Sequence, residues 1–211
     1  PRWRDKAVLV PENGIEPDRF PAPAPRLPES YGRPLRCVFL GRLVPFKGAD
    51  MVIDAAAPFL RTGDMTLSVI GFGPEQEALE AQAAALGVTV TFHGKIPHPA
   101  IPSRYEGFGL PTLEAMACGV VPVVLDYGGP AELITPETGF LLKLGFRADI
   151  VAALHTCFAE LVADPAVLSP MATAGIARVR DHFTWPAKAA QMMEVYRWAL
   201  GQRADKPAFT G

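Results

Sequence analysis

Two cations stand five residues apart in a loop that glycines bound on both sides. The loop runs from Gly41 to Gly48 and holds Arg42 and Lys47. Arginine offers a planar fork of N–H donors and lysine a mobile point charge, so the pair could clamp a diphosphate. Two loop cations are equally consistent with ordinary charges that water surrounds. The spacing therefore indicates a phosphate clamp only if other residues support it.

A second glycine pair follows the next apolar run. Gly71 and Gly73 stand as in a dinucleotide-binding fingerprint, but the third glycine of that pattern would fall on Gln76, so the fingerprint fails. What remains is a tight turn at which the backbone could approach a ligand closely. A strand-to-helix turn without any ligand explains the pair equally well.

The most informative stretch is a glycine-containing loop that runs directly into a helix predicted over 112–118. Free amides around Gly107 and Gly109, together with the positive end of the helix dipole, would form an anion site. Glu106 lies before this helix and Glu114 in its first turns. A ligand with phosphates and vicinal hydroxyls would account for the amides and both carboxylates. The alternatives are a dipole-stabilising glutamate at 114 and an ordinary loop charge at 106.

The elements that position these loops alternate in type from Leu35 onward. Apolar runs predict buried strands, and apolar residues at spacings of three and four predict helices between them. This alternation is typical of a doubly wound parallel α/β sheet, in which ligands bind beyond the carboxyl ends of the strands. Strands are predicted at 7–10, 37–40, 66–70, 88–92, 120–125 and 139–142. Helices are predicted at 52–60, 74–86, 112–118, 147–163, 165–182 with an interruption at Pro170, and 186–200.

Composition excludes several classes of function. Lysine and arginine total 20 against 22 aspartate and glutamate residues, a net charge of −2, so the chain lacks the basic surplus of a nucleic-acid-binding protein. No run approaches the roughly 18 apolar residues of a membrane span, and we expect no signal peptide at the start. Three cysteines at no metal-ligand spacing predict reduced thiols in a cytoplasmic protein.

Together, these motifs resemble those of glycosyltransferase family 4, the group 1 glycosyl transferases, which are retaining, metal-independent enzymes of the two-domain GT-B fold. The hallmark is the pair Glu106 and Glu114 within Glu-Gly-Phe-Gly-Leu-Pro-x-Leu-Glu-Ala-Met-Ala. Further matches in the same order are Gly41-Arg42…Lys47-Gly48, Gly71-x-Gly73-Pro74, Gly128-Gly129-x-x-Glu132, Thr138-Gly139 and, more weakly, Asn13-Gly14 and Phe183-Thr184-Trp185.

The resemblance implies a role for each candidate residue. Arg42 and Lys47 would neutralise the donor diphosphate and stabilise it as a leaving group. Glu106 would contact hydroxyls of the transferred sugar as a third catalytic residue, and Glu114 would hold the ribose hydroxyls. Donor contacts are further implied at Gly41, Gly71, Gly73, Lys95, Ile96, Gly107, Phe108, Gly109 and Leu110, with the backbone of Lys95 and Ile96 facing the base.

By the same resemblance, the chain is the donor-binding, C-terminal half of an enzyme. It would transfer a hexosyl unit from a UDP- or GDP-sugar to a hydroxyl with retention, in polysaccharide or glycolipid biosynthesis. No metal cofactor is expected, because Arg, Lys and a helix dipole would replace the cation. An N-terminal domain outside this chain would bind the acceptor glycan or lipid, and the full-length enzyme would contact the membrane peripherally. The alternatives are a sugar-nucleotide epimerase of the same fold and a non-catalytic nucleotide-sugar-binding subunit.

The resemblance also divides the chain and exposes a gap in it. An interdomain linker with a first strand is predicted at 1–34, a Rossmann-like nucleotide-sugar domain at 35–201 and a frayed tail at 202–211. The family places a helix and a strand between the equivalents of Gly94 and Pro102, where this sequence has no credible element. We therefore predict an omitted segment, most simply beside His98 and Pro99. There, neighbouring Cα atoms would lie farther apart than the roughly 3.8 Å of a trans peptide.

Overall fold

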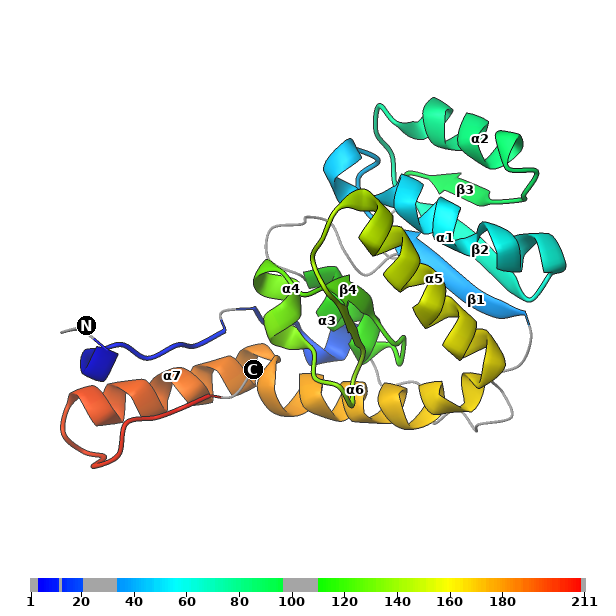
Figure 1. Cartoon of the computed structure of the whole chain (residues 1–211). Helices are drawn as coiled ribbons and strands as arrows, with labels where there is room; N and C mark the ends of the chain where they lie inside the picture. The colour runs from blue at the N-terminus through cyan, green and yellow to red at the C-terminus, as the bar shows by residue number, and fades with distance from the viewer. Residues whose placement is uncertain (1–3, 12, 21–33, 97–109, 210–211) are drawn as a thin grey trace.

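A computed structural model describes residues 4–11, 13–20, 34–96 and 110–209 of the chain (Figure 1). Parallel strands alternate with helices in it, which confirms the predicted α/β fold. The strands are β1 (Leu35–Leu40), β2 (Met65–Ile70), β3 (Thr91–Gly94), β4 (Val123–Leu125) and β5 (Phe140–Leu142). The helices are α1 (Ala49–Thr62), α2 (Gln76–Ala85), α3 (Leu110–Ala117), α4 (Gly128–Leu133), α5 (Arg147–Ala163), α6 (Leu168–His182) and α7 (Trp185–Ala199). Short 3₁₀ turns are η1 (Arg4–Lys6), η2 (Pro17–Arg19), η4 (Pro45–Lys47) and η6 (Pro165–Val167).

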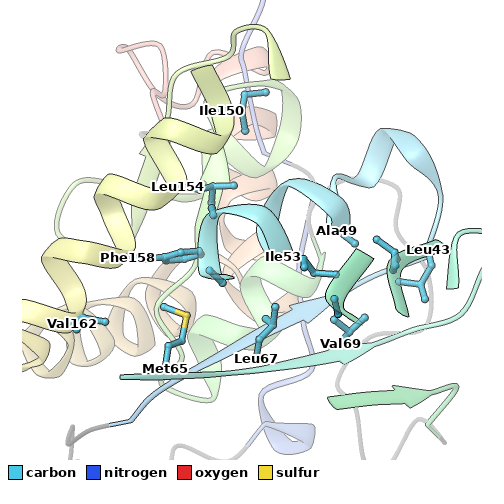
Figure 2. Packing of buried hydrophobic residues seen from close by; sticks show 14 residues of the cluster. Leu43, Ala49, Ile53, Met65, Leu67, Val69, Ile150, Leu154, Phe158 and Val162 are labelled. Atoms are coloured by element: carbon cyan, nitrogen blue, oxygen red, sulfur yellow. The ribbon is translucent and has the colours of Figure 1, made fainter. Parts of the chain in front are cut away.

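The main hydrophobic core lies between β2 and the helices α1 and α5 (Figure 2). Met65, Leu67 and Val69 alternate along β2 with more exposed residues, so they place their side chains on one face of the strand. Ile53 of α1 and Phe158 of α5 pack in the same cluster. This packing holds the start of α1, and with it the loop after β1, at the carboxyl end of the sheet.

A second core lies around α3. Leu113 and Met116 of this helix are fully buried and pack with Val179 of α6 and Phe183 beyond it. Ile15, from the leading segment, belongs to the same cluster. Burial on these neighbours fixes the orientation of α3, which carries one of the predicted site carboxylates.

Hydrogen bonding divides the strands of the described chain into two parallel groups. One has the order β1-β2-β3, with β1 and β2 paired from Leu35–Met65 to Leu40–Ile70, and the other consists of β4 and β5. The groups share a third cluster in which Leu35 packs near Val123, but β1 and β4 are not paired among the described residues. The predicted single sheet therefore has an interruption between β1 and β4.

Several predicted boundaries are wrong in the structure. Residues 7–10 form no strand, because no other described strand lies beside them to pair with. The helix expected from Pro74 begins at Gln76, since Pro74 and Glu75 form a turn. Pro170 does not interrupt a helix, because it lies in the first turn of α6, where a missing N–H costs no helical hydrogen bond. Helix α4 was not predicted, and the other helices and strands differ from the predicted ones by shifts of one to three residues at their ends.

The predicted frayed tail is also wrong over its described part. Arg203 Nη1 lies 2.6 Å from Glu194 Oε2 on α7, and Pro207 is fully buried. The chain after α7 therefore folds back along that helix (Figure 1). The predicted omission beside His98 and Pro99 lies outside the described residues.

Candidate functional site

The loops after β1 and β2 pack against each other, backbone on backbone. Leu43 N donates to Phe72 O over 3.0 Å, and Glu75 N donates to Leu43 O over 3.1 Å. A Cβ atom on Gly73 would lie 2.1 Å from Leu43 O, and one on Gly71 would lie 1.8 Å from Gly41 O. The contact between the two loops therefore leaves no room for a side chain at either glycine. Donor contacts at Gly41, Gly71 and Gly73 stay predictions.

Adding one methyl group at Gly73 should test this loop contact. We expect Gly73→Ala to lower the free energy of unfolding by about 3 kcal/mol, because the backbone of Leu43 cannot give way as a side chain would. Gly175→Ala is the matched control, since its Cβ would meet Met116 at an ordinary 3.7 Å. In helix α6 that change should stabilise by roughly 0.5–1 kcal/mol. Urea denaturation of both variants measures the difference, and equal stabilities would contradict the loop contact.

Arg42 and Lys47 lie in the loop that joins the carboxyl end of β1 to α1. Arg42 is exposed, and its guanidinium makes no ion pair with any residue that the structure describes. Lys47 ends the η4 turn and is half-buried. Gly48, at φ +73°, closes this turn and leads into α1, a left-handed conformation that suits glycine. The structure thus places both predicted cations beyond one strand end, where a parallel sheet binds ligands.

Glu114 lies in the second turn of α3 and is buried, with 8% of its surface exposed. Its Oε2 atom has no hydrogen-bond partner among the described residues. Burial raises the pKa of this carboxyl to about 8, and the charge of Arg19 lowers it to a smaller extent. The same burial, together with Glu114, raises the pKa of the Cys118 thiol one turn later. A buried carboxyl without a donor is costly, so this position indicates a ligand that supplies one.

Arg19 is a site residue that sequence reasoning missed. It ends the η2 turn, and the segment around it is fixed because Ile15 and Phe20 pack in the core of α3. Its charge lowers the pKa of Glu114, about a hundred positions later in the sequence, so the two residues are near each other in the fold. The Asn13-Gly14 motif marked this segment, but no local pattern could show that it lies beside α3.

Phe72 is a second residue that sequence reasoning missed. It is the central residue of the glycine turn after β2, half exposed, and Lys95 Nζ lies 5.4 Å from the centre of its ring. Lys95 and Ile96 follow β3, and the contact of their backbone with a base stays a prediction. An exposed ring with a cation over it is a surface on which a planar base could stack. The signal was the aromatic residue between the two glycines.

Part of the predicted site lies outside the described residues. This holds for Glu106, Gly107, Phe108 and Gly109. Leu110 is the first residue of α3. The described candidates are therefore the two cations after β1, the turn after β2, the residues after β3, and Glu114.

Three of the other motifs support the fold. Thr138 Oγ1 accepts a hydrogen bond from Thr135 N over 2.9 Å, and a Cβ on Gly139 would lie 2.7 Å from Pro122 O. Near the start of the chain, Gly14 packs under the ring of Trp185. Neighbouring Ile15 forms a parallel bridge with Thr184. These contacts join loops and chain ends.

The described ranges of the chain hold no group of three or more His, Cys, Asp or Glu side chains that could bind a metal ion. They also hold no single helix with the length and apolarity of a membrane span. Only α5 and the segment 165–182 together reach that length, and they are bent by 94°.

Solved structures that share this fold include glycosyltransferases. The C-terminal domain of a glycosyl transferase group 1 family protein from Francisella tularensis superimposes with a TM-score of 0.65 at 25% identity, covering 82% of this chain and all of that domain. Anabaena HepE, solved with UDP and glucose, gives a TM-score of 0.68 at 23% identity over 95% of this chain and 58% of its own. The chain thus has the fold of one half of a GT-B glycosyltransferase.

The family follows from the sequence comparisons. The family model for glycosyl transferases group 1 matches residues 27–160. A GDP-mannose-dependent alpha-(1-6)-phosphatidylinositol monomannoside mannosyltransferase from Mycolicibacterium smegmatis is 36% identical over 86% of this chain and 54% of its own length. A D-inositol 3-phosphate glycosyltransferase from Acidothermus cellulolyticus is 30% identical over 95% and 53%. The chain belongs to the group 1 glycosyl transferases.

The same comparisons show how much of each relative's length this chain covers. The chain spans about half of each of these two relatives. The alignment with the Mycolicibacterium protein is 213 residues long but takes in only 86% of this 211-residue chain. That relative therefore has residues at positions where this chain has none, and the predicted omission beside His98 and Pro99 stays a prediction.

Proposed function

We propose that this chain is the donor-binding half of a retaining, metal-independent hexosyltransferase. It would bind a UDP- or GDP-sugar, and the intact enzyme would transfer the sugar to a hydroxyl of a glycan or lipid. The observation that carries this is Glu114, a buried carboxyl whose Oε2 has no donor in the described structure. The vicinal hydroxyls of a ribose would supply two O–H donors to it.

The two cations after β1 complete the proposed chemistry. Cleavage of the bond between sugar and diphosphate leaves negative charge on the departing phosphate. Arg42 and Lys47 would stabilise that charge by acting where it develops. This role is the one a divalent cation plays in other transferases, which is why we propose that no metal takes part. The three cysteines are free thiols, which is compatible with the cytoplasmic location that we propose.

Binding and transfer should separate in this chain. We expect the 211 residues to bind UDP or GDP in the micromolar to millimolar range, roughly −8 to −4 kcal/mol, because the assigned groups all lie on this domain. Transfer should be absent. Positioning the acceptor supplies roughly 7–11 kcal/mol of barrier reduction, and it requires a second domain that binds the acceptor. Calorimetric titration with UDP, GDP and ADP measures the first, and product analysis with glycan and lipid acceptors measures the second.

The two outcomes test different parts of the proposal. A folded chain that binds no nucleotide would contradict the donor site. Acceptor-dependent glycoside formation by these residues alone would contradict the need for a second domain.

A further inference from the structure

Arg147 carries a charge that does not suit its position in its own helix. It is the first residue of α5, after the N-cap Phe146, and the positive end of a helix dipole disfavours a cation there. Its side chain contacts α1 instead. Arg147 Nε and Nη2 donate to Asp50 Oδ2 over 3.1 and 2.9 Å, and Nη2 also donates to Asp54 Oδ2 over 2.6 Å. The reason for this arginine therefore lies in α1.

Gln82, on α2, makes further contacts with the same two acidic residues. Its Nε2 donates to Asp54 Oδ1 over 2.6 Å and to the backbone oxygen of Asp50 over 3.0 Å. Helix α1 packs against both α2 and α5. Side chains from two neighbouring helices thus hold the first turns of α1 and fix the place of both carboxylates.

Both carboxylates lie close to the cations after β1. Asp50 follows Lys47 by three residues and stands in the first turn of α1, and Asp54 lies one helical turn further along. Three residues span at most about 11 Å. Without a counter-charge, Asp50 and Asp54 would therefore repel a diphosphate bound at Lys47. One guanidinium shared by two carboxylates leaves one net negative charge there instead of two.

Folding stability alone does not account for this arrangement. The side chain of Arg147 is 55% exposed, and those of Asp50 and Asp54 are 36% and 27% exposed. Ion pairs at such exposure contribute little to folding stability. An arginine at an unfavourable helix position, used on two acidic residues beside a proposed anion site, indicates a role in anion binding.

We propose that Arg147 is a positioning residue for the donor diphosphate, which acts by offsetting the charges of Asp50 and Asp54 and holding both carboxylates. Without Arg147, Asp50 would be free to pair with Lys47, since residues three apart are neighbours at the start of a helix. That pairing would compete with the diphosphate for the lysine. The inference rests on the proposed function, because it requires a diphosphate at Arg42 and Lys47.

Isothermal titration of the 211-residue chain with UDP and GDP, each beside its nucleoside, tests the proposal. At low salt, Arg147→Gln should weaken the binding of the nucleoside diphosphate roughly fivefold, because one more uncompensated negative charge then acts on it at about 10 Å. The binding of uridine or guanosine, which carry no charge, should stay the same. Arg147→Lys keeps the charge and should therefore bind the diphosphate nearly as well as the wild type.

Arg197→Gln is the matched control. Arg197 pairs with Glu194 on α7, and its side chain is 54% exposed, so this change removes the same charge from an equally exposed ion pair. Helix α7 packs on α6 rather than on α1 (Figure 1). The control should leave the affinity for both ligands unchanged.

Salt provides a second readout that a merely structural role would not change. Between about 0.01 M and about 1 M salt the Debye length falls from about 30 Å to about 3 Å. The ratio of diphosphate affinities between the wild type and Arg147→Gln should therefore approach one at high salt. A ratio that salt does not change would overturn the proposal.

Removing the carboxylates separates their charge from the contact between the helices. Asp50→Asn and Asp54→Asn, added to Arg147→Gln, remove both negative charges and leave α1 and α5 without their ion pairs. The diphosphate affinity should return at least to that of the wild type. Melting temperatures show that each variant is folded. A loss that the two asparagines do not reverse would overturn the proposal, and so would equal losses for diphosphate and nucleoside in Arg147→Gln.

The wild type in the same titrations separates this inference from the proposed function. A folded wild type that binds no nucleotide would contradict the donor site and this inference with it. A wild type that binds nucleotide, together with an Arg147→Gln variant that binds it equally well, would overturn this inference alone.

Discussion

Replacing Arg42 and Lys47 together by alanine should weaken the binding of UDP or GDP by at least about a hundredfold and leave that of uridine or guanosine nearly unchanged. Each change removes a charge-assisted contact worth roughly 1.5–3 kcal/mol, while the contacts to base and ribose remain. Isothermal titration of nucleoside diphosphate and nucleoside, side by side, measures the difference. The single variants should each show about half of the effect in free energy.

Glu114→Ala is the control that distinguishes the two kinds of contact. Because its proposed partner is the ribose, this change should weaken the binding of nucleoside diphosphate and of nucleoside by similar factors. Equal losses for both ligands in the Arg42 variant would contradict the assignment of that residue to the diphosphate.

The unliganded chain should lose stability as the pH rises from about 5 to about 8. Burial raises the pKa of Glu114 from its ordinary value of 4.5 to about 8, so the folded state holds a proton that the unfolded state has released in this range. The free energy of unfolding then falls with pH by at most about 1.4 kcal/mol per unit. Below the ordinary value both states are protonated, and above about 8 both are ionised, so the curve flattens at each end.

Glu114→Gln should remove this dependence, because an amide does not titrate. Melting temperatures of both proteins between pH 5 and 9 measure it. Arg19, from η2, and Cys118, on α3 itself, are the groups whose charge is coupled to this carboxyl. Cys118 does not reproduce the effect, because burial raises the pKa of its thiol above the ordinary value and so away from this window. A wild-type slope that persists in the glutamine variant would show that another group is responsible.

Bound nucleotide should reduce this loss of stability at rising pH if Glu114 accepts hydrogen bonds from the ribose hydroxyls. Those O–H donors favour the carboxylate, so binding near pH 7 should release a proton. Titrations in two buffers of different ionisation enthalpy would show that proton as a difference in the observed heat.

The parts of the fold that sequence patterns predicted are those that local residues determine. Helix α5 occupies the predicted range 147–163, because its apolar residues repeat at helical spacing over four turns. Residues 7–10 form an apolar run like that of a strand. A strand also needs a neighbouring strand to pair with, and the local pattern does not show whether one is present. Pro170 was misjudged for a related reason, since its effect depends on how far it stands from the start of its helix.

The site divides in the same way. The cations after β1 follow from loop spacing, and the structure places them at a strand end. The glycines after β2 were recognised as unusual, but their reason is the backbone of Leu43, a contact between two separate loops. The burial of Glu114 and the charge of Arg19 beside it arise from the packing of a leading segment on α3. Contacts between distant parts of the chain produce no periodic pattern in the sequence, so they could not be predicted from it.

The bridge between Ile15 and Thr184 has a consequence for how the chain could be rewired. It joins the leading segment to the start of α7, and the two run together in the same part of the molecule (Figure 1). A circular permutant that links the present ends and opens the chain at Gly63 would keep this contact as an internal one. Gly63 lies in an exposed turn between α1 and β2 with open space around it, the kind of place where new termini are tolerated. The contact between Ile15 and Thr184 should therefore form whichever of the two segments is synthesised first.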